Sequence, residues 1–190
     1  METVANGCRQ LGAEVEIGLV DVTDAKGLDA FILRVDAAHP LDLVIANAGV
    51  SGSMLGDIPF EQKLLKIYEI NVTGVFNTVN PILSKFKERQ NGQIAVVGSL
   101  SGFFDVPRST AYGSSKAAVQ AFCRGLRGLM KPYNVGVTIV CPGFVQSNFT
   151  KFTHKQGRPT PFLITSEKAA DLIKSGLEKN PSTIGKSLSS

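Results

Sequence analysis

The sequence predicts an α/β protein built on a doubly wound parallel sheet. Short, almost continuously apolar runs alternate along the chain with longer segments in which apolar residues recur three and four positions apart. Runs of the first kind suit strands that are covered on both faces, as in a parallel sheet between two layers of helices. The alternation of the two kinds of segment favours strands that are joined by crossover helices.

The first half of the chain is expected to supply two strands and two helices. Residues 15–20 and 41–46 are the apolar runs that predict strands. The helix predicted between them, over 24–38, carries apolar residues at helical spacing, namely Leu28, Phe31, Ile32 and Val35. A longer helix is predicted over 60–87 because the same spacing continues from Leu64 to Leu83.

The second half repeats the pattern. Residues 93–97 and 135–141 are predicted strands, and the helix between them, over 114–131, ends at Pro132 because proline cannot continue the hydrogen-bonding pattern. A last helix is expected to begin after Thr165 or Ser166 as the N-cap. Its apolar stripe is Ala169, Leu172, Ile173 and Leu177.

Composition indicates one domain over residues 1–190 and excludes several kinds of function. A chain of 190 residues with 43% hydrophobic content can bury one sizeable core. The net charge of +4 comes from dispersed basic residues, so we expect no nucleic-acid or membrane partner. Cys8, Cys123 and Cys141 are far apart and lack metal-ligand spacing, which predicts no metal and a reducing compartment. Without an apolar leader, the expected location is the cytoplasm.

Tyr112 and Lys116 lie four residues apart near the start of a predicted helix, so they share one face of it. A phenol with an ordinary pKa of about 10 must lose about 3 units to exchange protons near neutrality, which corresponds to about 4 kcal/mol. One cation about 4 Å away supplies about that much at an effective dielectric constant near 20, while burial acts in the opposite direction. With Ser99 and Asn71 upstream, the pair indicates redox chemistry.

These residues belong to an ordered set that resembles the short-chain dehydrogenase/reductase family. In chain order the set is residues 21–24, Ala46 to Gly49, Asn71, Ser99 to Gly102, Tyr112 with Lys116, and Pro142 to Ser147. A lone Tyr-x-x-x-Lys is a weak signal, but six elements in the family's order are specific. The resemblance runs from about Glu2 to Ile184. It implies an oxidoreductase that interconverts a secondary alcohol and a ketone with NAD or NADP.

The resemblance also implies a role for each residue of the catalytic set. Tyr112 would transfer the proton, and Lys116 would lower the pKa of the phenol and bind the nicotinamide ribose. Ser99 would hold the substrate oxygen, with Ser101 as a less favoured neighbour. Asn71 would open its helix and hold a water that leads to the lysine. The alternatives are a packed tyrosine, a solvated lysine and an ordinary mid-helix asparagine.

The cofactor-binding residues are likewise implied by the resemblance. Asp21 would meet the adenine amino group, and Val22 would border the adenine ring. Two segments would contact the rest of the cofactor, with Tyr112 and Lys116: Asn47, Ala48 and Gly49, and then Pro142, Gly143, Val145 and Ser147. Ala46 departs from the family's first asparagine, and Ser147 replaces the usual threonine. The choice between NAD and NADP depends on segments that this sequence does not contain.

The family's first strand, its glycine-rich turn and its second strand have no counterpart here, and residues 1–10 resemble the helix before the third strand. The expected sheet is therefore partial, with residues 15–20 either unpaired or moved against 41–46 and with an exposed edge. We expect weak cofactor binding, because the missing turn would hold the pyrophosphate. A catalytically incompetent remnant or an interaction module therefore stays open as an alternative.

The substrate is expected to be a small alcohol or carbonyl compound, bound beside a substrate-side loop over 144–165. Phenylalanines gather near the segments that face substrate in relatives, and they indicate either an apolar pocket or ordinary core packing: Phe103, Phe104, Phe144, Phe149, Phe152 and Phe162. For His154 in that loop we favour a solvent-facing position over contact with substrate. A homo-oligomer through helices 60–87 and 114–131 is implied by the relatives. A serine hydrolase is disfavoured because no Gly-x-Ser-x-Gly elbow occurs.

Overall fold

The computed structural model describes residues 1–104, 109–153 and 162–185. Its sheet has four parallel strands in the order β1-β2-β3-β4. The strands are β1 (Leu43–Ala46), β2 (Gln93–Val97), β3 (Gly136–Val140) and β4 (Thr183–Ile184). The α-helices are α1 (Glu2–Gln10), α2 (Ala25–Ala38), α3 (Phe60–Tyr68), α4 (Gly74–Arg89), α5 (Thr110–Met130), α6 (Asn148–Thr153) and α7 (Ser166–Glu178).

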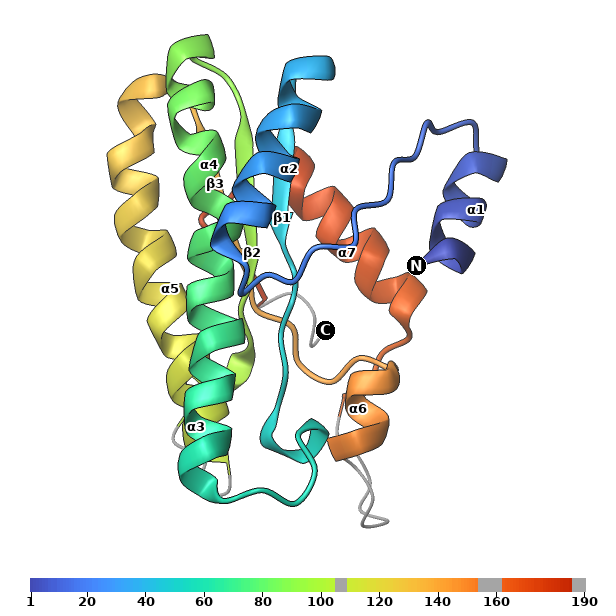
Figure 1. Ribbon diagram of the computed structural model, residues 1–190, viewed down its shortest axis with the longest axis vertical. Helices are drawn as coiled ribbons and strands as arrows, with labels where there is room; N and C mark the ends of the chain where they lie inside the picture. The colour runs from blue at the N-terminus through green and yellow to red at the C-terminus, as the bar shows by residue number, and fades with distance from the viewer. Residues whose placement is uncertain (105–108, 154–161, 186–190) are drawn as a thin grey trace.

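Helices cover both faces of the sheet, so the predicted doubly wound class is confirmed. Helices α2, α4 and α5 lie side by side on one face, and α7 covers the other (Figure 1). Strand β2 shows the alternation: Ile94 and Val96 point into the larger core cluster, whereas Ala95 joins Leu177 of α7 and Ile184 of β4. All three β2 side chains have no exposed surface, as the continuous apolar run predicts.

Residues 15–20 do not form the predicted strand. They run extended between α1 and α2 and belong to no ladder of the sheet, and β1 pairs with β2 alone among the described strands. A strand exists only where a neighbour exchanges backbone hydrogen bonds with it, and no neighbour stands there. Of the two outcomes expected for this segment, the unpaired one is confirmed. Leu19 is accordingly 86% exposed, while Val20 still packs against the core.

The predicted helix 60–87 is interrupted near its middle. Helix α3 passes into a π-helical turn, η2 (Glu69–Thr73), before α4 begins. A π-turn contains one residue more than an α-helical turn, a feature that often marks functional sites. The interruption contains Asn71, the residue for which an opened helix was expected.

The remaining elements lie close to their expected positions, with two additions. Helix α5 begins at Thr110, earlier than predicted, and is followed by a short 3-10 turn (Lys131–Tyr133) that contains Pro132. Thr165 is the N-cap of α7, where its hydroxyl accepts a hydrogen bond from the Lys168 amide at 3.2 Å. The two-residue strand β4 and the short helix α6 carry no distinctive periodicity, so the sequence pattern did not predict them.

Candidate active site

Helix α5 brings Tyr112 and Lys116 to the carboxyl ends of β2 and β3. Lys116 is 3% exposed, and its ammonium donates a hydrogen bond to the Val97 carbonyl oxygen at 2.7 Å. The same nitrogen lies 5.8 Å from the centre of the Tyr112 ring. Burial lowers the pKa of Lys116 to about 8, although the nearby Cys141 acts in the opposite direction.

The phenol of Tyr112 is held beside Ser99 and under an aromatic ring. Burial raises the pKa of Tyr112 above its ordinary value, and a hydrogen bond with the Ser99 hydroxyl offsets part of that rise. The Phe149 ring of α6 lies 5.7 Å from the Tyr112 ring, centre to centre. Burial outweighs that hydrogen bond, so the pKa of the phenol lies above its ordinary value, whereas the Tyr-Lys spacing had predicted a lowered one.

Ser99 follows β2 and caps a 3-10 turn, η3 (Leu100–Gly102). Its hydroxyl oxygen accepts a hydrogen bond from the Ser101 amide at 3.1 Å, and the side chain is largely buried. Its carbonyl oxygen accepts from the Gly102 amide at 3.1 Å and from the Gln120 side-chain amide at 2.7 Å. Of the two candidate serines, Ser99 is the one whose hydroxyl contacts Tyr112.

Asn71 has no exposed surface and joins three elements. Its Oδ1 accepts from the Val50 amide at 2.8 Å, and its Nδ2 donates to the Val50 carbonyl oxygen and to Ser115 Oγ, each at 3.0 Å. Ser115 Oγ in turn donates to the Tyr112 carbonyl oxygen at 2.8 Å. The asparagine side chain thus ties the loop after β1 to the helix that carries the tyrosine. The water-holding role stays a prediction.

The two segments expected at the nicotinamide end both follow strands of the sheet. Asn47 and Ala48, after β1, are exposed, and Gly49 is half-buried. A Cβ atom on Gly49 would lie 3.3 Å from Lys116 Nζ and 3.4 Å from Asn71 Oδ1, so the backbone passes close to both side chains.

After β3, Gly143 is exposed, and Pro142 and Val145 are half-buried. The Pro142 carbonyl oxygen accepts from the Leu100 amide at 3.1 Å, and Val145 forms a parallel bridge with Ile164. Ser147 Oγ lies 3.0 Å from Thr150 Oγ1, so this hydroxyl faces the start of α6. The bridge closes the base of the predicted substrate-side loop, of which residues 154–161, with His154, lie outside the described part.

Asp21 and Val22, expected at the adenine end, form the turn before α2. Asp21 is exposed, and its Oδ1 accepts from the Thr23 amide and hydroxyl, each at 2.8 Å; these bonds lower the pKa of Asp21. The Val22 carbonyl oxygen accepts from Asn77 Nδ2 at 2.8 Å. A Cβ atom on Gly74 would lie 2.7 Å from Val22 Cγ2. Contacts with α4 thus hold this turn in place.

The phenylalanines near the site are mostly at the surface. Four of them are too exposed for core residues: Phe103 at 52%, Phe104 at 66%, Phe144 at 41% and Phe162 at 76%. Core packing is therefore excluded for these four, whereas Phe149 packs on Tyr112. The Phe152 side chain lies outside the described residues. Phe149 thus places an aromatic side chain beside Tyr112, and the apolar substrate pocket stays a prediction.

The sequence reasoning missed two buried polar residues on α5, Ser115 and Gln120. Both stand in the face of the helix that carries Tyr112 and Lys116 and that otherwise packs on the sheet. A polar side chain within such a face is a signal, because buried polar groups need hydrogen-bond partners.

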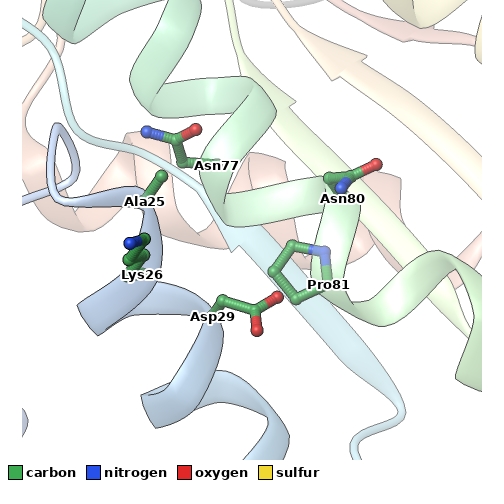
Figure 2. A pocket seen from close by; sticks show the side chains of 6 residues that line it. All are labelled: Ala25, Lys26, Asp29, Asn77, Asn80 and Pro81. Carbon is green, nitrogen blue, oxygen red and sulfur yellow. The ribbon is translucent and has the colours of Figure 1, made fainter.

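Two hollows lie away from these residues, beside α4. One, of about 230 Å³, is lined by side chains of α2 and α4: Ala25, Lys26, Asp29, Asn77, Asn80 and Pro81 (Figure 2). The other, of about 420 Å³, is lined by Phe76, Asn77, Asn80, Leu83 and Phe122 on α4 and α5. None of the predicted catalytic side chains lines either hollow.

None of the helices within residues 1–104, 109–153 and 162–185 has the length and apolar character needed to cross a membrane. In the same part of the chain, no three or more His, Cys, Asp or Glu side chains gather as metal ligands would.

Comparison with known proteins places this chain in a family. A family model described as short chain dehydrogenase matches residues 1–157. An uncharacterized oxidoreductase of Myxococcus xanthus is 33% identical over 97% of this chain and 72% of its own length. The uncharacterized oxidoreductase YusZ of Bacillus subtilis is 32% identical over 68% of this chain, which spans 46% of that relative.

A solved structure shows the same fold. The short-chain dehydrogenase from Sphingobium yanoikuyae in complex with NADPH superposes with a TM-score of 0.82 at 20% identity, over 97% of this chain and 72% of the other. The chain therefore belongs to the short-chain dehydrogenase/reductase family, whose members are oxidoreductases.

Proposed function

We propose that this chain carries the catalytic residues of an oxidoreductase that interconverts a secondary alcohol and a ketone with a nicotinamide cofactor. The observation that supports this most is the grouping of Tyr112, Ser99 and Lys116 at the carboxyl ends of β2 and β3. Ligands of open α/β sheets bind at that edge. The family membership and the NADPH in the Sphingobium relative agree with it.

The nicotinamide end of such a cofactor fits the residues present. Gly49 leaves free the space that a Cβ atom would occupy beside Lys116 Nζ and Asn71 Oδ1. The residues that would hold this end are Asn47, Ala48, Gly49, Tyr112, Lys116, Pro142, Gly143, Val145 and Ser147. When bound, the cofactor supplies or accepts a hydride. Asp21 and Val22 would meet the adenine end.

The residues present are less suited to bind the pyrophosphate group of the cofactor. No Gly-x-x-x-Gly-x-Gly run occurs in the sequence, so the chain lacks the amides that hold this group in dinucleotide-binding folds. We therefore predict weak binding of NADH and NADPH by these 190 residues alone. Titration of the purified chain by fluorescence or calorimetry measures this affinity, and micromolar, saturable binding to a monodisperse sample would contradict the prediction.

The proposed proton transfer follows from the phenol's surroundings. Because burial raises its pKa, Tyr112 keeps its proton at neutral pH and can donate it to the oxygen of a ketone during reduction. The Ser99 hydroxyl, which is already hydrogen-bonded to the phenol, would also hold the ketone oxygen of the substrate. The Lys116 ammonium would stabilise the phenolate that remains. In alcohol oxidation the phenolate would accept the proton, so oxidation should accelerate as pH rises.

The matched pair Tyr112→Phe and Tyr133→Phe tests the assignment, because Tyr133 lies away from the carboxyl edge of the sheet. With NADPH and cyclohexanone at saturating concentrations, Tyr112→Phe should lower turnover by at least about 100-fold, while Tyr133→Phe keeps the parent rate. Cofactor affinity should not change in either variant. Turnover of Tyr112→Phe within tenfold of the parent would reject Tyr112 as the acid. Lys116→Ala should cost both rate and cofactor affinity.

A second candidate function is association between copies of this chain, with or without catalysis. The hollow on α4 and α5 is apolar, and Phe76 at its rim is 39% exposed although it packs on Phe122 at 4.8 Å between ring centres. Phe76→Glu should shift an oligomer toward monomers in sedimentation velocity, with Leu11→Glu, at an exposed position outside both helices, as the control. A parent that sediments as a monomer would exclude this candidate.

A further inference from the structure

Gln120 makes an unusual contact for a residue in the middle of a helix. Its side chain is 2% exposed, and its Nε2 donates a 2.7 Å hydrogen bond to the carbonyl oxygen of Ser99. It stands one turn beyond Lys116 and two turns beyond Tyr112, on the same face of α5. The helix that carries the phenol of Tyr112 therefore also donates a hydrogen bond to the backbone of Ser99.

The turn that follows Ser99 is built around this amide. A Cβ atom on Gly102 would lie 2.4 Å from Gln120 Nε2 and 2.9 Å from the Ala117 backbone nitrogen, so the turn can approach α5 only because residue 102 is glycine. On its other side the same stretch is held by β3, through the Gly98 amide to the Val140 carbonyl oxygen at 2.7 Å. Gln120 supplies the attachment on the helix side.

We propose that Gln120 is a positioning residue for Ser99, holding its backbone so that its hydroxyl meets Tyr112 and the substrate oxygen. The catalytic part of this statement rests on the proposed function, whereas the contact between Ser99 and Tyr112 does not. A displacement of about 1 Å can cost about 100-fold in rate at such a site, so a fixed carbonyl has a direct chemical consequence. The competing explanation is that Gln120 only fills space between α5 and the turn.

A double-mutant cycle separates the two explanations. Ser99→Ala removes the hydroxyl but keeps the carbonyl oxygen that Gln120 holds, so any purely structural cost of Gln120→Met is the same in both backgrounds. The readout is the titration midpoint of Tyr112, followed by NMR on tyrosine labelled with carbon-13 at Cζ. Lys116 stays in place in all four proteins, so its charge is common to them. Neither cofactor nor substrate is needed.

Positioning predicts that Gln120→Met raises the Tyr112 midpoint by a measurable part of the rise that Ser99→Ala causes, because the hydroxyl no longer meets the phenol. In the Ser99→Ala background, Gln120→Met should leave the titration midpoint of Tyr112 unchanged. A midpoint that does not respond to Gln120→Met, or that moves equally in both backgrounds, would overturn the proposal.

The chain offers a matched control. Gln93 also donates its side-chain amide to a backbone carbonyl oxygen, that of Leu177 at 3.0 Å, on the opposite face of the sheet. Gln93→Met should lower the melting temperature and leave Tyr112 unchanged. If Gln120→Met does not fold, Gly102→Ala serves instead, because its methyl group displaces the amide without removing it. It should raise the midpoint in the same direction.

The catalytic arm uses NADPH and cyclohexanone. Gln120→Met should lower kcat about tenfold or more and leave the KM for NADPH unchanged. In the Ser99→Ala background, adding Gln120→Met should not lower kcat any further. Equal losses in the two backgrounds would reject positioning. If the parent shows no turnover at NADPH concentrations that the titration shows to be bound, the proposed function fails, and the midpoints of Tyr112 still decide the role of Gln120.

Discussion

Arg89, in the last turn of α4, holds Asp36 of α2 through both of its terminal nitrogens, at 3.0 and 2.8 Å. The Asp36 carboxylate is 5% exposed and also accepts from the Leu41 amide at 2.9 Å. The Leu41 carbonyl oxygen accepts from Arg89 at 3.2 Å. One partly buried ion pair thus fixes the two helices to the segment that leads into β1.

Removal of one partner should therefore be costly. Arg89→Met leaves a buried carboxylate without its cation, so the free energy of unfolding should fall by about 3 kcal/mol in urea denaturation. Arg9→Met, which removes an exposed pair with Glu2, should cost less than about 1 kcal/mol. Similar losses in the two variants would show that the Asp36 pair is no stronger than a surface contact.

The same pair predicts sensitivity to acid. Burial by itself raises the pKa of Asp36, but the Arg89 hydrogen bonds and the Leu41 amide outweigh it, and the pKa lies below the ordinary value of 3.8. A lowered pKa contributes stability above that ordinary value, and the contribution is lost as pH falls through the lowered one. Asp36→Asn should accordingly flatten the loss of stability below pH 4, as measured by circular dichroism.

Lys116 predicts a change in the stability of the fold at alkaline pH. Because its pKa is lowered from 10.5 to about 8, the folded protein loses this proton first, and its stability should rise between about pH 8 and pH 10.5 relative to Lys116→Met. The full difference corresponds to about 3 kcal/mol. Because Cys141 and Lys116 act on each other's pKa, both proteins should also carry Cys141→Ala, so that the comparison isolates the lysine. A pH-independent difference in urea midpoints would contradict the lowered pKa.

Asn71 should be hard to replace. Asn71→Leu leaves the amide and carbonyl of the half-buried Val50 without partners, beside a side-chain position with no exposed surface, which should cost about 2 to 4 kcal/mol of unfolding free energy. Asn77→Leu, at a half-buried position that donates once to Val22, is the comparison and should cost about 1 kcal/mol. Chemical denaturation measures both, and an equal cost would mean that the extra bonds of Asn71 contribute nothing.

The free edge of β1 should promote association. Ile45 is 46% exposed on a strand that pairs on one side only, within the described sheet. A lysine there should discourage edge-to-edge pairing, so Ile45→Lys should reduce light scattering of concentrated samples without lowering the melting temperature. Val44→Lys, at a neighbouring but buried position, should instead destabilise the fold. Unchanged scattering of Ile45→Lys would place the association elsewhere.

The sequence pattern predicted the helices and strands that are determined by the residues of the segment itself. Residues 93–97 form a strand because every position suits a covered sheet, and α5 follows its apolar stripe. Residues 15–20 are also mostly apolar but form no strand, because a strand needs a pairing neighbour and the sequence pattern does not report one. The sequence also identified Tyr112 and Lys116 as a pair. The sign of the phenol pKa shift depended on burial, which spacing alone does not measure.

The π-helical turn at Glu69–Thr73 makes the site depend on the number of residues in a helix as well as on their identity. If Val72 were deleted, α3 and α4 could join as one regular α-helix, because a π-turn is an α-helical turn with one residue inserted. Each residue advances an α-helix by about 100°, so Asn71 would then turn by about that angle relative to α4. The asparagine would still be present in the chain, yet it would no longer face Val50 and Ser115.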